Sequence, residues 1–488
     1  MPANFRPGVL SSAASLAAHL ALSLAGNGEA MITGVAIDSR AVRPGDLFVA
    51  LAGERADGHD FVCEAARRGA AAALVARRSA EELPQLIAPD PLAALQRLAV
   101  LVRAESSYRL AAITGSLGKT TTKEFLAALL ATTFRVGATR GSRNSQAAFP
   151  AELCNQPAGL DWMVAELGMN HAGELDRLGA IARPDMLAYT TIAPVHLEFF
   201  AGIEGIAAAK AELIPHLAPA GLLVLNLADA RVAAFAGRFA GECAGYGLPG
   251  ASDLWIEAYA GRGLLGAAFV LRGAGLAIPI DWEIAGRHQA DNLLAASLCA
   301  LRAGVPPAAI GAAAASLRPA LHRGEILRLP GAATLIDDSY NSSPKAALAL
   351  LDLLGQTPGR RIAVLGEMLE LGEQSLSLHR EVGRRAAEVA EIVIAVGAEA
   401  ARALAAAAGG ARVFHTEDAA AALLLLRPLL QLGDVALVKG SRGIGLDRLV
   451  SGLLEESGEL EAGSRQQATS DDCPARPAAD RQRSCETA

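Results

Sequence analysis

A short glycine-rich turn between an apolar run and a helical run constrains this chain more than any other feature. Residues 110–113 are apolar, residues 125–130 have a helical pattern, and between them lie Gly115, Ser116, Leu117, Gly118, Lys119, Thr120 and Thr121. Glycines let backbone N–H groups surround phosphate oxygens at the positive end of the following helix. The lysine then reaches the outer phosphates, and the next hydroxyl binds Mg²⁺. The pattern predicts a strand, a phosphate-binding loop and a helix; an ordinary glycine-containing turn is the alternative.

The length and composition indicate a large, packed protein of several domains. The chain has 488 residues, of which 52% are hydrophobic and 19% are charged. Its net charge of −7 provides no basic surface for non-specific binding of nucleic acid. No apolar run reaches the length of an integral membrane segment. We interpret the alanine- and leucine-rich residues 9–25 as an amphipathic helix rather than a signal peptide.

The six cysteines are scattered, and no two of them form a C-x-x-C pair. Isolated cysteines in a large chain fit reduced thiols rather than a disulfide framework. We therefore expect the protein in the cytoplasm.

Strand-like and helix-like segments alternate along most of the chain, which predicts an α/β protein with parallel sheets and crossover helices. We expect a small N-terminal α/β domain over residues 1–85 and a central phosphate-loop domain over residues 95–318. A C-terminal, Rossmann-like doubly wound domain is expected over residues 319–460. Residues 461–488 are polar and aperiodic, which predicts a disordered tail.

Within these domains the pattern predicts strands and connectors at particular places. Residues 77–91 are polar and contain three prolines, which indicates a connector. Residues 252–284 are rich in strand formers, and we expect an added hairpin layer on the central domain. The central parallel strands are predicted at 110–114, 162–167, 186–191 and 221–225. Those of the third domain are predicted at 334–338, 361–365, 392–396, 413–415 and 435–439.

Three polar residues accompany the central strands. Glu166 ends an apolar strand, at the sheet edge where parallel sheets bind ligands, and a carboxylate there suits Mg²⁺. His196 comes just after the next predicted strand, and Lys210 lies on the helix that follows. The alternatives are a surface glutamate, a hydrogen-bonded loop histidine and a solvated helix lysine.

In the third domain, two polar turns follow predicted strands. Asp338 and Asn341 lie where a ribose or the reacting phosphate region would bind, unless they form a plain Asx turn before the next helix. Lys439 and Arg442 follow the last strand and could hold a carboxylate, or they could be ordinary loop cations.

Taken together, these residues resemble the Mur ligase family, ATP-dependent amino-acid ligases of cell-wall precursor synthesis, over about residues 30–450. The resemblance rests on the phosphate loop with its trailing Thr-Thr-Lys-Glu, on Glu-x-Gly-x-Asn-His at 166–171, on His-Leu-Glu at 196–198, on the Lys210 helix and on residues 286–292. It implies a ligase that uses ATP and Mg²⁺ to form an amide through an acyl phosphate.

Three segments point to the member of the family that adds D-alanyl-D-alanine to a UDP-N-acetylmuramoyl tripeptide. They are residues 38–40 with 43–51 and 57–61, residues 337–341 with Pro344, and residues 365–372 with 438–442. The resemblance therefore implies these two small-molecule substrates, and we expect a monomer. Another amide ligase of the same family with a different amino substrate is an alternative, and a nucleotide-driven switch protein is a second one.

The resemblance also implies roles for single residues. Lys119, Thr120 and their loop neighbours would hold ATP phosphates and Mg²⁺, and Glu166 and His196 would bind a second Mg²⁺. Lys210 corresponds to a lysine that is carbamylated in several relatives. Residues near the nucleotide would be Asn292, Arg323 and Asp338, and those near the UDP-linked substrate would be Ser39, Arg40 and Asn144. The chain departs from the family pattern in having one asparagine, Asn144, where a pair is usual, and His322 where glycine usually precedes Arg323.

Overall fold

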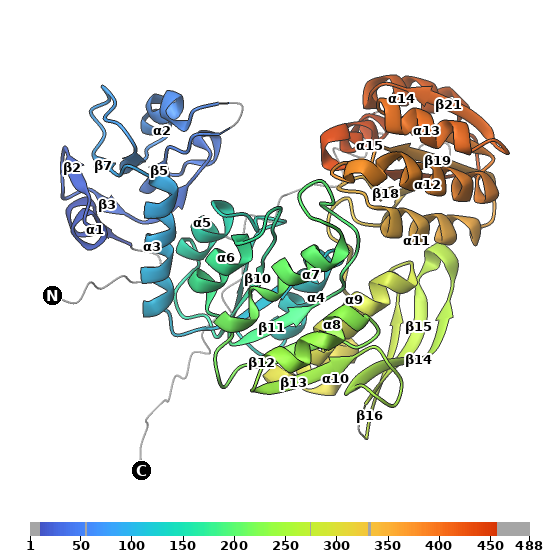
Figure 1. The fold of residues 1–488 in the computed structure, drawn as a ribbon, viewed down its shortest axis with the longest axis horizontal. Coiled ribbons are helices and arrows are strands. Elements are labelled where there is room, and N and C mark those ends of the chain that lie inside the picture. Colours follow the sequence, from blue (N-terminus) through green and yellow to red (C-terminus); the bar gives the residue numbers. More distant parts are fainter. Residues whose placement is uncertain (1–9, 54–55, 274, 330–332, 456–488) are drawn as a thin grey trace, which may run out of the picture.

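The computed structural model describes residues 10–53, 56–273, 275–329 and 333–455, and these form three α/β domains in chain order (Figure 1). The predicted fold class is confirmed. The predicted tail at 461–488 lies outside the described residues. No helix in the part of the chain that the structure describes has both the length and the hydropathy needed to cross a bilayer.

The N-terminal domain is built on a five-stranded sheet in the order β2–β7–β6–β5–β4. Strands β4 to β7 are parallel, and β2 pairs with β7 in the antiparallel direction. The elements are β1 (Ser11–Ser12), α1 (Ala13–Leu20), β2 (Ser23–Ala25), β3 (Met31–Ile32), β4 (Gly34–Ala36), β5 (Asp46–Val49), α2 (Val62–Arg67), β6 (Ala72–Val75) and β7 (Gln85–Ile87). Helix α1 confirms the helix expected within residues 9–25, and Ser12 caps it.

The connector expected at residues 77–91 is wrong in part, because it contains β7. The Ser79 N–H donates to Gln85 Oε1 at 2.8 Å, and Gln85 Nε2 donates to the Glu81 carbonyl at 2.9 Å. These bonds fold the polar stretch back on itself, so that Leu86 is fully buried in the sheet. A three-residue strand has too little periodicity to be recognised in such a segment.

The middle domain is built on a nine-stranded sheet in the order β16–β15–β14–β13–β12–β11–β8–β10–β9. Its strands are β8 (Arg109–Thr114), β9 (Val136–Ala138), β10 (Trp162–Glu166), β11 (Met186–Tyr189), β12 (Leu222–Asn226), β13 (Glu242–Tyr246), β14 (Leu254–Gly261), β15 (Ala267–Gly273) and β16 (Leu276–Trp282). Its helices are α3 (Pro91–Glu105), α4 (Lys119–Ala131), α5 (Ala148–Cys154), α6 (Glu174–Ala182), α7 (Ile203–Ala211), α8 (Ala230–Ala233), α9 (Arg287–Ala303) and α10 (Pro307–Ala314). The four predicted central strands are confirmed.

Strand β8 lies inside this sheet and is covered on both faces. Leu110 and Ala112 belong to the core that α3, α6 and α7 cover, whereas Ala111 and Ile113 belong to the core formed with α4, α9 and α10. Successive strand residues point to opposite faces, so an apolar run such as 110–113 suits a strand buried on both sides. This position places the phosphate loop at the carboxyl end of an interior strand, between β11 and β10.

The hairpin expected at residues 252–284 on the central domain is present, but it forms no separate layer, because β14 to β16 extend the same sheet. Strand β14 pairs with β13 in parallel, and β15 and β16 then add antiparallel strands at the edge (Figure 1). Buried residues alternate with half-buried ones in β15 and mainly with exposed ones in β16, which is the pattern of an edge hairpin whose one face packs on α10.

The third domain has a six-stranded sheet in the order β17–β18–β22–β19–β20–β21. Its elements are β17 (Glu325–Arg328), β18 (Thr334–Asp338), α11 (Pro344–Gly355), β19 (Arg361–Gly366), α12 (Ser375–Val389), β20 (Ile392–Val396), α13 (Glu399–Ala407), β21 (Arg412–Thr416), α14 (Ala419–Leu426), β22 (Val435–Lys439) and α15 (Leu446–Glu455). Helices α11, α12 and α13 share one core with the sheet, and α14 and α15 share the core of the other face. All five predicted strands are present, and the antiparallel edge strand β17 is additional.

Candidate active site

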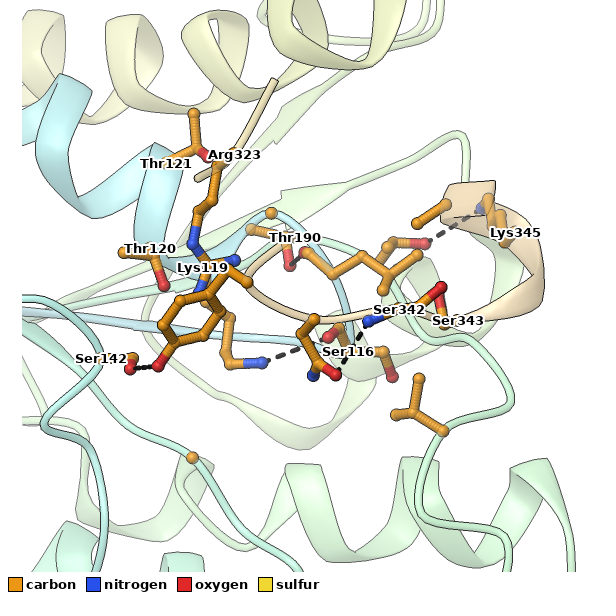
Figure 2. Close-up of a pocket in the computed structure, with 18 of the residues that line it drawn as sticks. Ser116, Lys119, Thr120, Thr121, Ser142, Thr190, Arg323, Ser342, Ser343 and Lys345 are labelled. Atoms are coloured by element: carbon orange, nitrogen blue, oxygen red, sulfur yellow. Dashed lines mark hydrogen bonds between the residues drawn. The ribbon is translucent and has the colours of Figure 1, made fainter. Parts of the chain in front are cut away.

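A cavity of about 640 Å³ lies between the middle and third domains. The middle domain lines it with the phosphate loop and the carboxyl ends of its central strands, and the third domain lines it with the turns after β18, β19 and β22. The predicted site residues that line it are Ser116, Gly118, Lys119, Thr120, Thr121, Asn144, Glu166, His196, Asn292, Arg323, Asp338, Asn341, Lys439 and Arg442. Figure 2 shows Arg323 reaching across toward the phosphate loop.

Two positions in the loop between β8 and α4 require glycine. Gly115 has φ +143°, and a Cβ there would lie 1.9 Å from Thr190 Oγ1; Gly118 has φ +80°, and its Cβ would lie 2.2 Å from Asn292 Oδ1. The loop is also fixed to the segment after β11, because Ser116 N–H donates to the Thr191 carbonyl at 2.6 Å. The backbone is therefore held as a turn open toward the cavity, at the N-terminus of α4, where an anion is favoured.

Lys119 is the first residue of α4 and projects into the cavity. Its Nζ donates to the Ser116 carbonyl at 3.2 Å, so the side chain curls over the loop (Figure 2). Desolvation lowers the pKa of Lys119, Arg323 acts in the same direction, and Glu166 opposes them. An anion in the loop would relieve the repulsion between the two cations.

Glu166 ends β10 and is 1% exposed. The Thr120 hydroxyl donates to Glu166 Oε2 at 2.6 Å, and Asn144 Nδ2 donates to Oε1 at 2.6 Å. The surface glutamate considered as an alternative is thus wrong. The hydroxyl and the carboxylate form the kind of hard oxygen set that Mg²⁺ prefers.

His196 follows β11 and meets a residue of the other domain. Its Nδ1 is hydrogen-bonded to the carboxylate of Glu370, in the turn after β19. Glu370 also accepts the Glu198 N–H at its carbonyl, at 3.2 Å. The structure thus brings Thr120 and Glu166 together. Nδ1 of His196 is instead bonded to Glu370, a residue that sequence reasoning did not single out.

Lys210 lies on α7, behind the cavity lining. It is 1% exposed, so the solvated helix lysine considered as an alternative is wrong. Burial and then Lys119 lower its pKa well below the ordinary value, and Glu166 opposes them. Among the described residues, none accepts a hydrogen bond from its Nζ, whereas its carbonyl accepts one from the Tyr189 hydroxyl at 2.7 Å. A buried amine without a hydrogen-bond acceptor beside a carboxylate is a reactive arrangement.

The third domain contributes cations held in two different ways. Lys439 is 2% exposed, and its Nζ donates to Asp338 Oδ2 at 2.8 Å and to the Asn341 carbonyl at 2.9 Å, so it is not an ordinary loop cation. Arg323 and Arg442 flank the Tyr340 ring, with Cζ 4.2 and 5.0 Å from its centre. Tyr340, to which sequence reasoning assigned no role, also meets the Ser142 hydroxyl of the middle domain.

Ser39 and Arg40 lie outside this cavity, on the N-terminal domain. The Ser39 hydroxyl donates to Glu64 at 2.7 Å, and Arg40 pairs with Asp38 at 2.7 Å. The pKa of Asp38 is lowered, chiefly by Arg40, and Arg143 of the middle domain contributes. This surface therefore faces the loop that carries the consecutive residues Arg143 and Asn144.

Three family models match consecutive parts of the chain: "Mur ligase family, catalytic domain" over residues 31–105, "Mur ligase middle domain" over 113–300, and "Mur ligase, glutamate ligase domain" over 322–442. The UDP-N-acetylmuramoyl-tripeptide--D-alanyl-D-alanine ligase of Escherichia coli (strain K12) is 33% identical over 435 residues, covering 86% of this chain and 93% of that protein. The chain belongs to the Mur ligase family. The resemblance identified from sequence motifs is confirmed.

Solved structures give the same result. A crystal structure of MurF from Acinetobacter baumannii is 30% identical, covers 91% of this chain and 99% of its own, and superposes with a TM-score of 0.82. A MurF ligase from Thermotoga maritima, solved in complex with ADP, is 28% identical, covers 87% and 98% of the two chains, and has a TM-score of 0.74.

Proposed function

We propose that this chain is an ATP-dependent ligase that joins D-alanyl-D-alanine to UDP-N-acetylmuramoyl tripeptide in peptidoglycan precursor synthesis. The observation that carries the proposal is the interdomain cavity, where a phosphate loop with Lys119 faces Arg323 and Arg442 of another domain. Relatives across most of the chain bear the name of this ligase. A cavity shared by two domains suits a reaction that joins two substrates.

The residues present fit ATP and Mg²⁺. Gly115 and Gly118 keep the loop backbone clear of side chains, and Lys119 supplies a cation beside it. Thr120 and Glu166 would hold one Mg²⁺, and His196, Glu166 and modified Lys210 would hold a second. When bound, Mg²⁺ would neutralise charge between the phosphates and the incoming carboxylate. Ser116 and Thr121 would adjoin the phosphates, Asn292 the adenine, and Arg323 and Asp338 the nucleotide from the third domain.

The chemistry needs positioning and charge neutralisation, without a protein nucleophile. The tripeptide carboxylate attacks the γ-phosphorus of ATP, ADP leaves, and an acyl phosphate forms. The amine of D-alanyl-D-alanine then attacks the acyl carbon, and inorganic phosphate leaves. Lys119 and Arg323 lower the barrier because they offset the repulsion between carboxylate and phosphate.

Lys210 would act as a carbamate, a metal-binding carboxylate that forms when its neutral amine attacks CO₂ and releases a proton to the solvent. The lowered pKa supports this, because only a neutral amine attacks CO₂. Burial behind the cavity, next to Glu166 and Lys119, gives the modified side chain a place between the proposed metal ligands.

The organic substrates would enter from opposite sides. Ser39 and Arg40 would lie along the UDP portion, and Asn144, near that surface and bonded to Glu166, would lie near the tripeptide end. Arg442, which is exposed and lines the cavity, would hold the carboxylate of the dipeptide, with Asn341 and the Lys439 turn shaping that side. We propose action as a monomer in the cytoplasm; the four cysteines in the described part are free thiols.

The test is a reconstitution with ATP, Mg²⁺, UDP-muramoyl tripeptide and D-alanyl-D-alanine. We expect the amide product by mass spectrometry, with one phosphate released per product. Lys119→Ala should lower the rate about 100- to 1000-fold. Panels of other muramoyl peptides and other dipeptides separate this ligase from family members with a different amino substrate. ATP binding without amide from any pair would contradict the proposal.

A further inference from the structure

His322 lies in the hinge, the segment at residues 315–324 that links α10 of the middle domain to β17 of the third. It has φ +59°, a left-handed backbone conformation that bulky residues rarely adopt. The residue is 8% exposed, and its Nδ1 lies 2.7 Å from Oδ2 of Asp337, which is fully buried. A residue with a bulky side chain keeps this backbone conformation only where its contacts with the surrounding structure hold it there.

The contacts of His322 fasten the hinge to the end of β18. Its N–H donates to Glu325 Oε2 at 2.7 Å, and its carbonyl accepts the Tyr340 N–H at 3.2 Å. The other oxygen of Asp337 accepts the N–H and the hydroxyl of Ser339, at 3.1 and 2.6 Å. These bonds fix both ends of the turn that carries the next residue, Arg323.

Arg323 is the hinge residue that enters the cavity (Figure 2). Its guanidinium lies over the Tyr340 ring, and its carbonyl accepts from Gln289 Nε2 of α9 at 3.0 Å. The middle domain thus holds the backbone of Arg323. The contacts of His322 fix the direction of the chain immediately before that residue.

The surroundings of His322 favour its protonated form. Its charged neighbours are Asp337 on β18, Glu325 on β17 and Asp447 on α15, and all three raise its pKa, with the Asp337 hydrogen bond the largest cause and burial in opposition.

We propose that His322 is a positioning residue whose bond to Asp337 holds the hinge in the conformation that directs Arg323 at the nucleotide. This inference rests on the proposed function, because it takes ATP as the ligand of Arg323. Since the pKa is raised, the charged pair is present at lower pH and is lost as the pH rises through the raised value.

Two substitutions separate the effect of the backbone conformation at residue 322 from the effect of its side chain. His322→Gly accepts φ +59° freely but removes the donor to Asp337, whereas His322→Asn also tolerates this region and keeps a neutral donor. We expect His322→Gly to raise KM for ATP and Kd for ADP about tenfold, with a smaller change in kcat. His322→Asn should stay near the wild type at neutral pH. The wild-type KM for ATP should rise with pH, and that of His322→Asn should not.

Ala21→Gly is the matched control. Ala21 has φ +50° at the end of α1 in the N-terminal domain, so glycine relieves the same kind of backbone strain away from the cavity, and we expect an unchanged KM for ATP. Unchanged ADP affinity in His322→Gly, even with a lower unfolding midpoint, overturns the inference. So does an identical pH profile for wild type and His322→Asn, which decides the matter if His322→Gly does not fold. Wild-type protein that binds ADP but makes no amide contradicts the proposed function instead, and ADP affinity still tests the hinge.

Discussion

Glu370 of the third domain is hydrogen-bonded to His196 of the middle domain, so that a loop from each domain meets inside the cavity. Both residues have a left-handed backbone, with φ +63° for Glu370 and +57° for His196. A carboxylate on one imidazole nitrogen fixes the ring and leaves the other nitrogen for a ligand. The contact therefore links the orientation of His196 to the seating of the third domain.

Removal of the Glu370 carboxylate should weaken catalysis, although we propose no contact between Glu370 and a substrate. We expect Glu370→Ala to lower kcat for ligation about 10- to 100-fold and to raise the Mg²⁺ concentration needed for half-maximal rate. Titration of the rate with Mg²⁺ measures both. Glu373→Ala, an exposed glutamate three residues further on, is the control and should match the wild type. Equal ligation rates for the two variants would show that the function of His196 does not depend on Glu370.

The same contact should respond to acid. The hydrogen bond from His196 lowers the pKa of Glu370 below the ordinary 4.5, with burial in opposition. A lowered folded pKa gives stability that is present above 4.5 and is lost as the pH falls through the lowered value. Wild type should therefore unfold at a higher temperature than Glu370→Gln at neutral pH, and the gap should narrow in acid. A gap that stays constant across this range would contradict the prediction.

The positions of the lysines identify the site more sharply than the spacing of its motifs does. The chain has only five lysines among its 44 basic residues: Lys119, Lys123, Lys210, Lys345 and Lys439. Three of them line the cavity, Lys210 lies behind it, and Lys123 bonds the backbone of residues 139 and 141 in the loop that carries Asn144. Because the chain uses arginine elsewhere and lysine only here, the sequence alone marks these positions.

An amine-selective reagent should consequently inactivate the enzyme by reaction within the cavity. We expect inactivation to follow modification of Lys119, which lines the cavity and has a lowered pKa, and MgATP to protect it. Peptide mapping by mass spectrometry identifies the modified lysines. Inactivation that proceeds at the same rate with saturating MgATP would place the sensitive amine outside the nucleotide site.

The elements that carry local signals could be predicted from the sequence. The phosphate loop is predictable because glycine, lysine and threonine occur in a fixed order between a strand and a helix. Glu166 is predictable because it ends an apolar strand, and the ends of parallel strands gather at one edge. By contrast, the bond between His196 and Glu370 spans 174 positions in the chain. No local pattern encodes how two domains face one another, so this pair and the Tyr340–Ser142 contact needed the structure.

Lys210 should be distinguishable as a modified residue. Lys210→Arg keeps a positive charge but cannot form a carbamate, so we expect ligation to fall about 100-fold, as far as in Lys210→Ala. Wild-type protein kept in bicarbonate should carry the added mass of one CO₂ on the peptide that contains Lys210, and Lys210→Arg should not. Full activity in Lys210→Arg would show that the buried cation, rather than a carboxylate, is what the site requires.

Gly115 offers a test of the phosphate loop that separates crowding from backbone strain. In Gly115→Ala the new Cβ would meet Thr190 Oγ1 at 1.9 Å, in a buried wall that is hydrogen-bonded to the loop itself. Gly304→Ala is the control, because Gly304 has φ +100° in the same domain and no atom within 4 Å of its Cβ position. We expect both variants to lose about 1 kcal/mol of stability from the left-handed backbone. Only Gly115→Ala should lose more than this and bind ADP at least tenfold more weakly, because its loop must shift. Calorimetric titration with ADP and thermal unfolding measure the two effects, and equal ADP affinity in both variants would mean that the turn tolerates a side chain.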